Sequence, residues 1–185
     1  AAEWSAAVGL DVNGEISYLN ELQFMTYTRW LLADGRPGAA LSILDRLRIE
    51  AEQCSRNRTV IESLILQALA HQAVGDEISA IKALNGALGI GRHENYVRSF
   101  IDEGESVAKL LVLSLKQNGK QWEAEDPDIL VYVIRLNEVF GQTALPAKAP
   151  RPMLETDVLP WWYVNDPLSE RELEVIQLVA QGYSN

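Results

Sequence analysis

Apolar residues recur at intervals of three and four positions along most of the chain, which is the spacing of one face of an α-helix. No stretch shows the strict alternation of apolar and polar residues, bounded by turn residues, that is typical of a strand. We therefore expect an all-α fold. The predicted helices cover residues 18–33, 37–56, 58–74, 76–90, 105–116 and 127–141, with a less regular segment at residues 92–104.

The ends and faces of these helices are predicted from single residues. Gly35 suits the left-handed position that ends the first helix. Asn57 and Asp76 are residue types that cap the N-terminus of a helix. The first helix is expected to face the core with Leu22, Met25, Thr28 and Leu32.

A short motif occurs twice with the same internal spacing. The sequence LADG at residues 32–35 is followed by Ala40, and QAVG at residues 72–75 is followed by Ala80. Glycine lets two helices fold back on each other, and a small alanine lets the second helix approach the first. The pattern is typical of tetratricopeptide-like helical hairpins, which stack into a superhelical array. The last two predicted helices lack the motif and form a divergent or capping hairpin; the alternative is an irregular helical bundle with two chance matches.

The segment at residues 142–166 separates this predicted helical repeat domain, residues 1–141, from the C-terminal residues 167–185. It holds four of the seven prolines, a density that disfavours a continuous helix. It is expected to be a Pro-rich linker or a docking arm, because its cluster of Trp161, Trp162 and Tyr163 favours burial against another surface.

The C-terminal segment carries the signals for the start and the end of one helix: a capping box preceded by a leucine, an apolar face and a terminal glycine. The residues with these roles are Leu168, Ser169, Glu172, Leu173, Ile176 and Gly182. The sequences LSERELEV at residues 168–175 and GYSN at residues 182–185 resemble the opening of the helix-turn-helix domain of LuxR-type transcription regulators. The resemblance implies a truncated domain without the recognition helix that reads DNA bases.

The two hairpins and the segment YVRSFIDEG at residues 96–104 resemble the MalT-like subclass of these regulators. The resemblance implies a large ATP-dependent activator with an upstream nucleotide-binding module, a helical-repeat sensor and a C-terminal DNA-binding domain. The chain contains no Gly-x4-Gly-Lys-Ser/Thr loop, so no cofactor is expected in this fragment and ATP is expected in the upstream module of the parent protein. The implied function is the sensing of a small-molecule inducer or an adaptor protein, with DNA bound only through the complete parent protein.

A second interpretation is an independent tetratricopeptide-like scaffold for protein–protein interaction, with no inducer and no ATP partner. The two interpretations differ in the upstream sequence of the native gene, because only a MalT-like regulator requires a phosphate-binding loop there.

Composition narrows the classes of function. Of 185 residues, 26 are acidic and 16 basic, which gives a net charge of −10, and 48% are hydrophobic. An acidic surface repels the phosphate backbone, so the fragment by itself is expected to bind DNA poorly. No signal peptide or apolar membrane span is evident, so we expect a cytoplasmic protein with no membrane partner. The sequence leaves the oligomeric state open, including a homo-oligomer.

Residue types that support catalysis or metal binding lack the necessary partners in the sequence. One cysteine and two histidines cannot supply the four ligands of a structural zinc site. His71 is expected in a helix and His93 in a loop, and neither they nor Cys54 belong to a recognisable nucleophile–base arrangement. The acidic runs lack the spacing of a calcium loop. We therefore expect neither an enzyme nor a metal site.

Two regions supply candidate contacts to an effector or a partner. The candidate residues are Tyr96, Arg98, Asp102 and Glu103 in the segment 96–104, and Arg29 and Trp30 in the first helix. Arginine and tyrosine suit a hydroxyl- or phosphate-bearing ligand and are frequent anchors of interfaces. The alternatives are structural: Arg98 pairs with Asp102 one helical turn away while Tyr96, Phe100 and Ile101 cover the end of the second hairpin, and Trp30 packs in the core.

Overall fold

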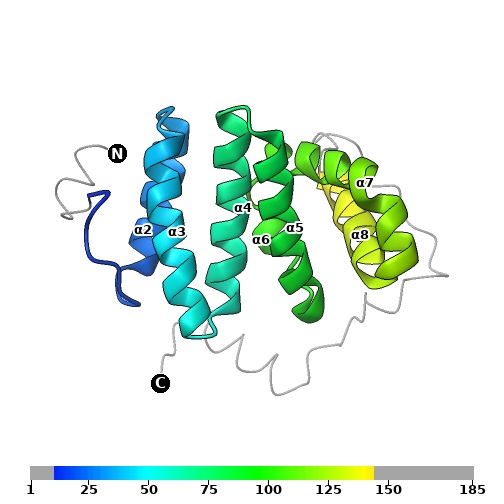
Figure 1. Ribbon diagram of the computed structural model, residues 1–185, viewed down its shortest axis with the longest axis horizontal. Coiled ribbons are helices and arrows are strands. Elements are labelled where there is room, and N and C mark those ends of the chain that lie inside the picture. Colours follow the sequence, from blue (N-terminus) through cyan, green and yellow to red (C-terminus); the bar gives the residue numbers. More distant parts are fainter. Residues whose placement is uncertain (1–10, 144–185) are drawn as a thin grey trace, which may run out of the picture. The chain divides into compact units, whose positions relative to one another are not determined.

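The computed structural model describes residues 11–143, and throughout this range the regular secondary structure is helical (Figure 1). This confirms the all-α prediction. The helices are α2 (Glu21–Ala33), α3 (Pro37–Gln53), α4 (Asn57–Ala73), α5 (Glu77–Glu94), α6 (Arg98–Ile101), α7 (Glu105–Glu125) and α8 (Pro127–Thr143).

Helices that follow each other in the chain pack side by side as hairpins. Helix α2 pairs with α3, α4 with α5, and α7 with α8 (Figure 1). The second hairpin contacts the first through α3 and α4, and it contacts the third through α5. The short helix α6 lies against α4, α7 and α8. The hairpins therefore stack in the order in which they occur in the sequence.

A left-handed residue follows four successive helices, at equal intervals along the chain. These residues are Gly35, Ser55, Gly75 and Asn95, with φ of 72°, 54°, 81° and 56°. After each of them, the next backbone N–H bonds to the carbonyl five residues earlier, over 2.9 to 3.0 Å. The glycines at the first and third turns are the residues that the repeated motif singles out. One helix and its turn therefore form the smaller repeating unit of the structure, and a hairpin of two helices forms the larger one.

Several predicted helix boundaries are wrong by three residues or more. Helix α2 begins at Glu21 rather than at residue 18, and α3 ends at Gln53 rather than at residue 56. Helix α5 continues to Glu94, which places His93 in its last turn instead of a loop. Helix α7 continues through Gly119 to Glu125 instead of ending at residue 116, and this extension buries Trp122 against the core.

The buried face of α2 also differs from the prediction. Its buried residues are Phe24, Met25, Tyr27, Thr28 and Leu31. Leu22 is 75% exposed and Leu32 is only partly buried. The reason is that α2 packs against both α3 and α4, and this double contact turns a wide face inward.

The two predicted N-caps have different outcomes. Asp76 caps α5, because its carboxylate accepts a hydrogen bond from the backbone N–H of Ser79 at 3.0 Å. Hydrogen bonding from the Ser79 side chain, together with this backbone bond, lowers the pKa of Asp76. Asn57 does not cap α4; it is the first residue of that helix, and its amide donates to Oε1 of Glu94 at 3.2 Å.

The interior consists of two apolar clusters that meet at α4. The first cluster lies among α2, α3 and α4 and includes Leu31 and Leu66. The second lies among α4, α5, α7 and α8 and includes Ile65, Phe100 and Leu136. Neighbouring residues on α4 thus enter different clusters. No helix in this part of the chain is long and apolar enough to cross a membrane.

Two predicted regions lie outside the described residues. Helix α8 ends at Thr143, just inside the predicted linker 142–166, and the rest of that linker is not described. The predicted C-terminal helix, with Leu168, Ser169, Glu172, Leu173, Ile176 and Gly182, is not described either. Both remain predictions.

Candidate functional site

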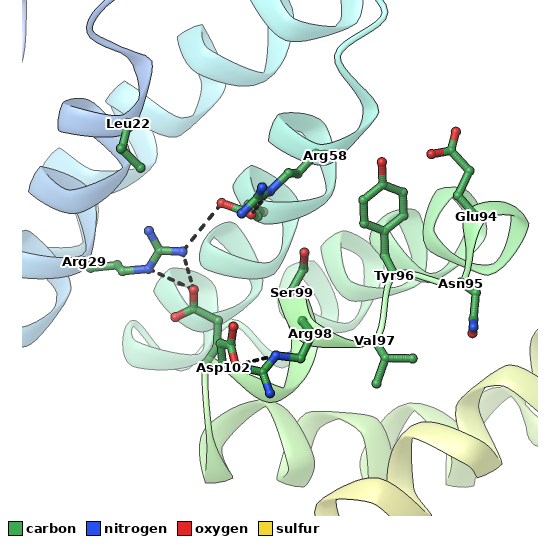
Figure 2. A pocket seen from close by; sticks show the side chains of 12 residues that line it. Leu22, Arg29, Arg58, Glu94, Asn95, Tyr96, Val97, Arg98, Ser99 and Asp102 are labelled. Carbon is green, nitrogen blue, oxygen red and sulfur yellow. Dashed lines mark hydrogen bonds and ion pairs between the residues drawn. The ribbon is translucent and has the colours of Figure 1, made fainter. Parts of the chain in front are cut away.

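A groove with a volume of about 480 Å³ lies between the first two hairpins and the connection that leads to the third. One wall consists of Leu22 and Arg29 from α2 and of Arg58 and Glu62 from α4. The opposite wall consists of residues 94–99 with Asp102 and Glu103 (Figure 2). We call this cavity the charged groove, because seven of its lining residues are arginine, aspartate or glutamate.

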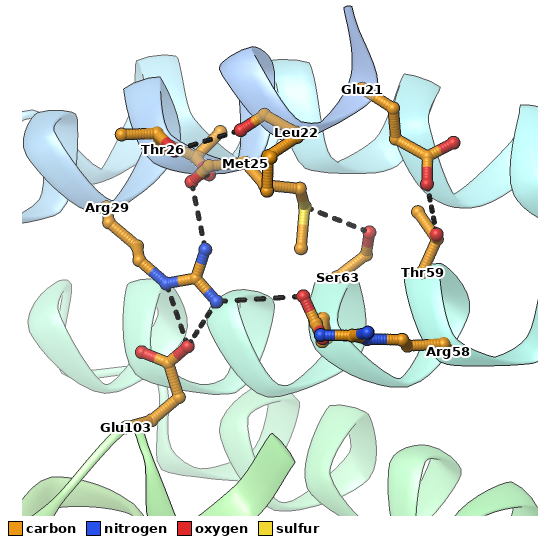
Figure 3. Close-up of polar contacts among 11 residues, drawn as sticks. Glu21, Leu22, Met25, Thr26, Arg29, Arg58, Thr59, Ser63 and Glu103 are labelled. Carbon is orange, nitrogen blue, oxygen red and sulfur yellow. Dashed lines mark hydrogen bonds and ion pairs between the residues drawn. The ribbon is translucent and has the colours of Figure 1, made fainter. Parts of the chain in front are cut away.

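An ion pair between Arg29 and Glu103 joins the two walls. Nε and Nη2 of Arg29 donate to Oε1 of Glu103 at 2.8 and 2.5 Å (Figure 3). Oε2 of Glu62 lies 3.8 Å from the same Nη2. The Arg29 side chain is 37% exposed and that of Glu103 is 13% exposed, so water screens the pair only in part. It links two residues that are 74 positions apart in the sequence.

Further polar contacts align α2 with α4 below the groove. The hydroxyl of Thr59 donates to the carboxylate of Glu21. The hydroxyl of Ser63 donates to Sδ of Met25 at 3.9 Å (Figure 3). These contacts fix the register of α2 on α4, and this register places Arg29 opposite Glu103.

The second wall is held in place by one buried aromatic residue and one hydrogen bond. Phe100 is fully buried and packs edge-on against Tyr132, with ring centroids 6.0 Å apart. The phenol of Tyr132 donates to the carbonyl of Tyr96 at 2.6 Å. Left-handed residues stand at both ends of the segment, Asn95 before it and Gly104 after it, so the backbone turns sharply on either side. The polar side chains of the segment can therefore face the groove while Phe100 enters the core.

Two arginines stand at the rim of the groove, each paired with the acid one turn further along its helix. Nε of Arg58 donates to Oε1 of Glu62 at 2.9 Å, and this bond raises the pKa of Arg58. Nε of Arg98 lies 3.6 Å from Oδ1 of Asp102, and both of these side chains are largely exposed. Both acids approach Nε, and the Nη atoms of both arginines make no hydrogen bond to the described residues.

Tyr96 stands beside Arg58 at the same rim. A hydrogen bond with the Glu94 carboxylate is the main reason that the pKa of Tyr96 is raised, and burial adds to it. The groove thus presents guanidinium donors, carboxylate acceptors and a neutral phenol, which are groups that bind polar ligands by charge-assisted hydrogen bonds.

The structure unites most of the residues that the sequence singles out. Arg29 belongs to the same groove as Tyr96, Arg98, Asp102 and Glu103, although the sequence placed them in two separate regions. Arg98 pairs with Asp102 and also lines the groove, so its two interpretations do not exclude each other. Trp30 does not line the groove. It stacks on Tyr27 with ring centroids 5.5 Å apart and packs against the first apolar cluster.

Sequence reasoning missed Arg58 and Glu62. The signal that locates them is the repeat itself. Arg58 and Glu62 occupy the same positions relative to Gly35 as Arg98 and Asp102 occupy relative to Gly75, and both pairs form ion pairs across one helical turn. Extending the repeat from the turn glycines to the charged residues would have identified this second pair.

No group of three or more histidine, cysteine, aspartate or glutamate side chains in residues 11–143 is arranged to hold a metal ion. Nδ1 of His71 lies 3.8 Å from Oδ2 of Asp76 at the turn between α4 and α5. Cys54 is exposed at the end of α3. Neither residue lines the charged groove.

Comparison with known proteins adds three findings. The family model of the MalT-like TPR region matches residues 1–117, a range that contains every residue lining the groove. The HTH-type transcriptional regulator MalT of Vibrio cholerae is 22% identical over 171 residues, which are 91% of this chain and 19% of that regulator. The chain thus spans about a fifth of the length of the curated relative it matches. No solved structure matches the chain.

Proposed function

The chain belongs to the family of MalT-like TPR regions, and from this premise we propose that its charged groove senses the effector or the protein partner of a LuxR-type, ATP-dependent transcription activator. The named relative, a helix-turn-helix transcriptional regulator, supports the link to transcription. In this proposal the chain acts in the cytoplasm, and the nucleotide-binding loop and the DNA recognition helix belong to other parts of the parent protein.

The observation that carries the proposal is the Arg29–Glu103 pair across the groove. It connects α2, in the first hairpin, to the residue just before the third hairpin begins. A ligand that enters the groove meets both partners of this pair. Because a ligand shifts a conformational equilibrium by the difference in its affinity for the two states, a contact that ties the first hairpin to the segment leading into the third is well suited to report occupancy.

The charge of the chain supports a sensing role over a DNA-binding role for this segment. The net charge of −10 disfavours direct contact with the phosphate backbone. The guanidinium groups of Arg29 and Arg58 already have carboxylate partners, so they do not form a basic patch. Binding of DNA is therefore assigned to the complete parent protein.

A thermal-shift screen of the 185-residue chain tests this function. Sugars, nucleotides, aromatic metabolites and short peptides are added one at a time, because a ligand that binds the folded state raises the unfolding midpoint. We expect at least one compound class to raise the midpoint, and we expect Arg98→Ala to abolish that rise by removing a rim donor.

The matched control is Lys109→Ala, which removes a charge from an exposed side chain on α7 that is paired with Glu105 outside the groove. This variant should keep the full ligand-induced shift. If a folded Arg98→Ala variant and a folded Arg29→Ala variant both respond like the wild type, the sensing site is not the charged groove.

A further inference from the structure

We propose that the Glu103 carboxylate is bound to the Arg29 guanidinium at the position where a ligand anion binds. The charged groove then binds a carboxylate- or phosphate-bearing ligand by displacing Glu103. This inference rests on the proposed function of the groove as a binding site and names the chemistry of its ligand. It makes Arg29 the group that holds the ligand and Glu103 a built-in competitor.

The hydrogen-bond geometry of the Arg29–Glu103 pair is poorer than the geometry that a free anion can achieve. Nε and Nη2 of Arg29 converge on one oxygen, Oε1 of Glu103, while Oε2 makes no hydrogen bond to the described residues. A carboxylate or phosphate that is free to orient itself can offer one oxygen to each of the two N–H groups, which is the bidentate arrangement that arginine prefers. A ligand anion therefore gains directional hydrogen bonding that Glu103 does not achieve.

Both partners are placed so that the exchange can occur. The Arg29 side chain lines the groove and is partly exposed, so a ligand reaches its guanidinium without passing through the core. The carboxylate of Glu103 has Arg29 as its sole partner among the described residues. Gly104 follows it with φ of 78°, beyond the end of α6, so Glu103 belongs to no regular helix that would fix its direction.

The charge balance of the groove is preserved in the exchange. Three arginines face four carboxylates in the groove: Arg29, Arg58 and Arg98 against Glu62, Glu94, Asp102 and Glu103. When the Glu103 side chain rotates out to solvent and a ligand anion takes its place, the groove again holds three guanidinium groups and four anionic groups. The nearby acid Glu62 is already paired with Arg58, which limits its repulsion of the incoming anion.

Displacement also provides a signal. The Arg29–Glu103 pair connects α2 to the segment between α6 and α7, so its loss releases one tie between the first hairpin and the connection that leads to the third. Glu103 and the ligand anion compete for Arg29, so each weakens the binding of the other. Any change that removes Glu103 from Arg29 must therefore raise the affinity of the groove for the anion.

The test uses the 185-residue chain and the NMR signal of the Nε–H group of Arg29, assigned by its absence in Arg29→Lys. Sodium phosphate and sodium succinate are titrated separately against chloride at constant ionic strength. In Glu103→Gln we expect either anion to shift this signal at a concentration at least about fivefold lower than in the wild type. In the double variant Arg29→Ala/Glu103→Gln the tighter binding, followed on neighbouring backbone amides, should be lost. The probe with the larger gain distinguishes a phosphate ligand from a carboxylate ligand.

Glu94→Gln calibrates the effect of charge alone. It removes one negative charge from the same groove while leaving Arg29 and Glu103 in contact, so its gain in affinity should be clearly smaller than that of Glu103→Gln. Equal gains in the two variants, or no gain in Glu103→Gln, overturn the displacement proposal. If Arg98→Ala abolishes the ligand-induced rise in the unfolding midpoint but Glu103→Gln gains no affinity for the anions, the groove is a sensing site for a ligand of different chemistry. If neither effect is seen, the groove is not the sensing site.

Discussion

Two nearby glycines in α5 have opposite surroundings. A Cβ atom on Gly91 would lie 3.0 Å from Oη of Tyr132 and 3.2 Å from Cε2 of Phe100. The Tyr132 hydroxyl is held by the Tyr96 carbonyl and Phe100 is fully buried, so neither can easily move away. A Cβ atom on Gly89 would meet nothing within 4 Å. Gly91 is therefore required by packing, whereas Gly89 is not.

We expect Gly91→Ala to lower the free energy of unfolding by about 1–3 kcal/mol, the usual cost of an extra methyl group in a packed core. We expect Gly89→Ala to raise it by about 0.5–1 kcal/mol, because alanine restricts the unfolded chain and favours the helix. Urea unfolding followed by circular dichroism measures both changes. Equal effects of the two substitutions would contradict this account of α5.

Tyr132 gives the fold a dependence on alkaline pH. Burial of its phenol raises the pKa of Tyr132 in the folded chain. The stability that follows from this shift is complete below the pKa of an unfolded tyrosine, near ~10, and is lost as the pH rises above it, since the unfolded chain then releases a proton that the folded chain keeps. Each further pH unit should lower the free energy of unfolding by about 1.4 kcal/mol from this group.

Tyr132→Phe separates the two roles of the hydroxyl. At neutral pH it should cost about 0.5–1.5 kcal/mol through loss of the hydrogen bond to the Tyr96 carbonyl. Above pH ~10 its stability should fall less steeply than that of the wild type. Urea midpoints across this range measure the difference, and Tyr18→Phe, which removes a largely exposed phenol, is the matched control. Parallel pH profiles for Tyr132→Phe and the wild type would exclude Tyr132 as the cause.

At the level of the element, the sequence identifies the left-handed positions that glycine occupies and misses the left-handed positions that other residues occupy. Gly35 and Gly75 mark two left-handed positions because glycine adopts them without steric cost. Ser55 and Asn95 adopt the same conformation, but serine and asparagine are common elsewhere and carry no comparable signal. Two of the four regularly spaced left-handed positions, Ser55 and Asn95, therefore could not be identified from the sequence.

Helix lengths were underestimated where glycine lies inside a helix. Helix α5 continues past its predicted end through Gly91, and α7 continues through Gly119. A glycine costs a helix only about 1 kcal/mol, and the burial of a large side chain further along more than offsets it. Trp122 in α7 has this role. Local propensity predicted an early end for α7, and tertiary packing of Trp122 extends this helix.

The candidate site was predictable only in the parts that are local in sequence. Arg98 and Asp102 form a pair across one helical turn, which their spacing indicates directly. The contact of Arg29 with Glu103 depends on three hairpins stacking in register, so no local pattern contains it. Arg29 entered the sequence analysis as an interface residue and Glu103 as part of a motif. Their pairing is the result of the fold.

At the level of the whole described region, the two apolar clusters lie at opposite ends of the stack of hairpins and share α4. The first hairpin contributes Leu31 to one cluster, and the third hairpin contributes Leu136 to the other; both side chains are fully buried. Helix α4 supplies residues to both clusters and so couples the outer hairpins. In repeat proteins, stability is a sum of terms within repeats and between neighbours, so damage to an outer repeat stays local.

Leu31→Ala and Leu136→Ala therefore form a matched pair of substitutions at opposite ends of the stack. Each should cost about 2–5 kcal/mol in the free energy that protects its own cluster. Hydrogen exchange measured by mass spectrometry should show faster exchange in α2 and α3 for Leu31→Ala, with α7 and α8 nearly unchanged, and the converse for Leu136→Ala. The Arg29–Glu103 pair ties α2 to the segment just before α7. Leu31→Ala, which loosens α2, should therefore also release Glu103 and speed exchange in the backbone amides of that segment. Uniform acceleration in every helix for both variants would mean that the region unfolds as one cooperative unit, and a groove within such a unit would have no separate hairpin motion to report its occupancy.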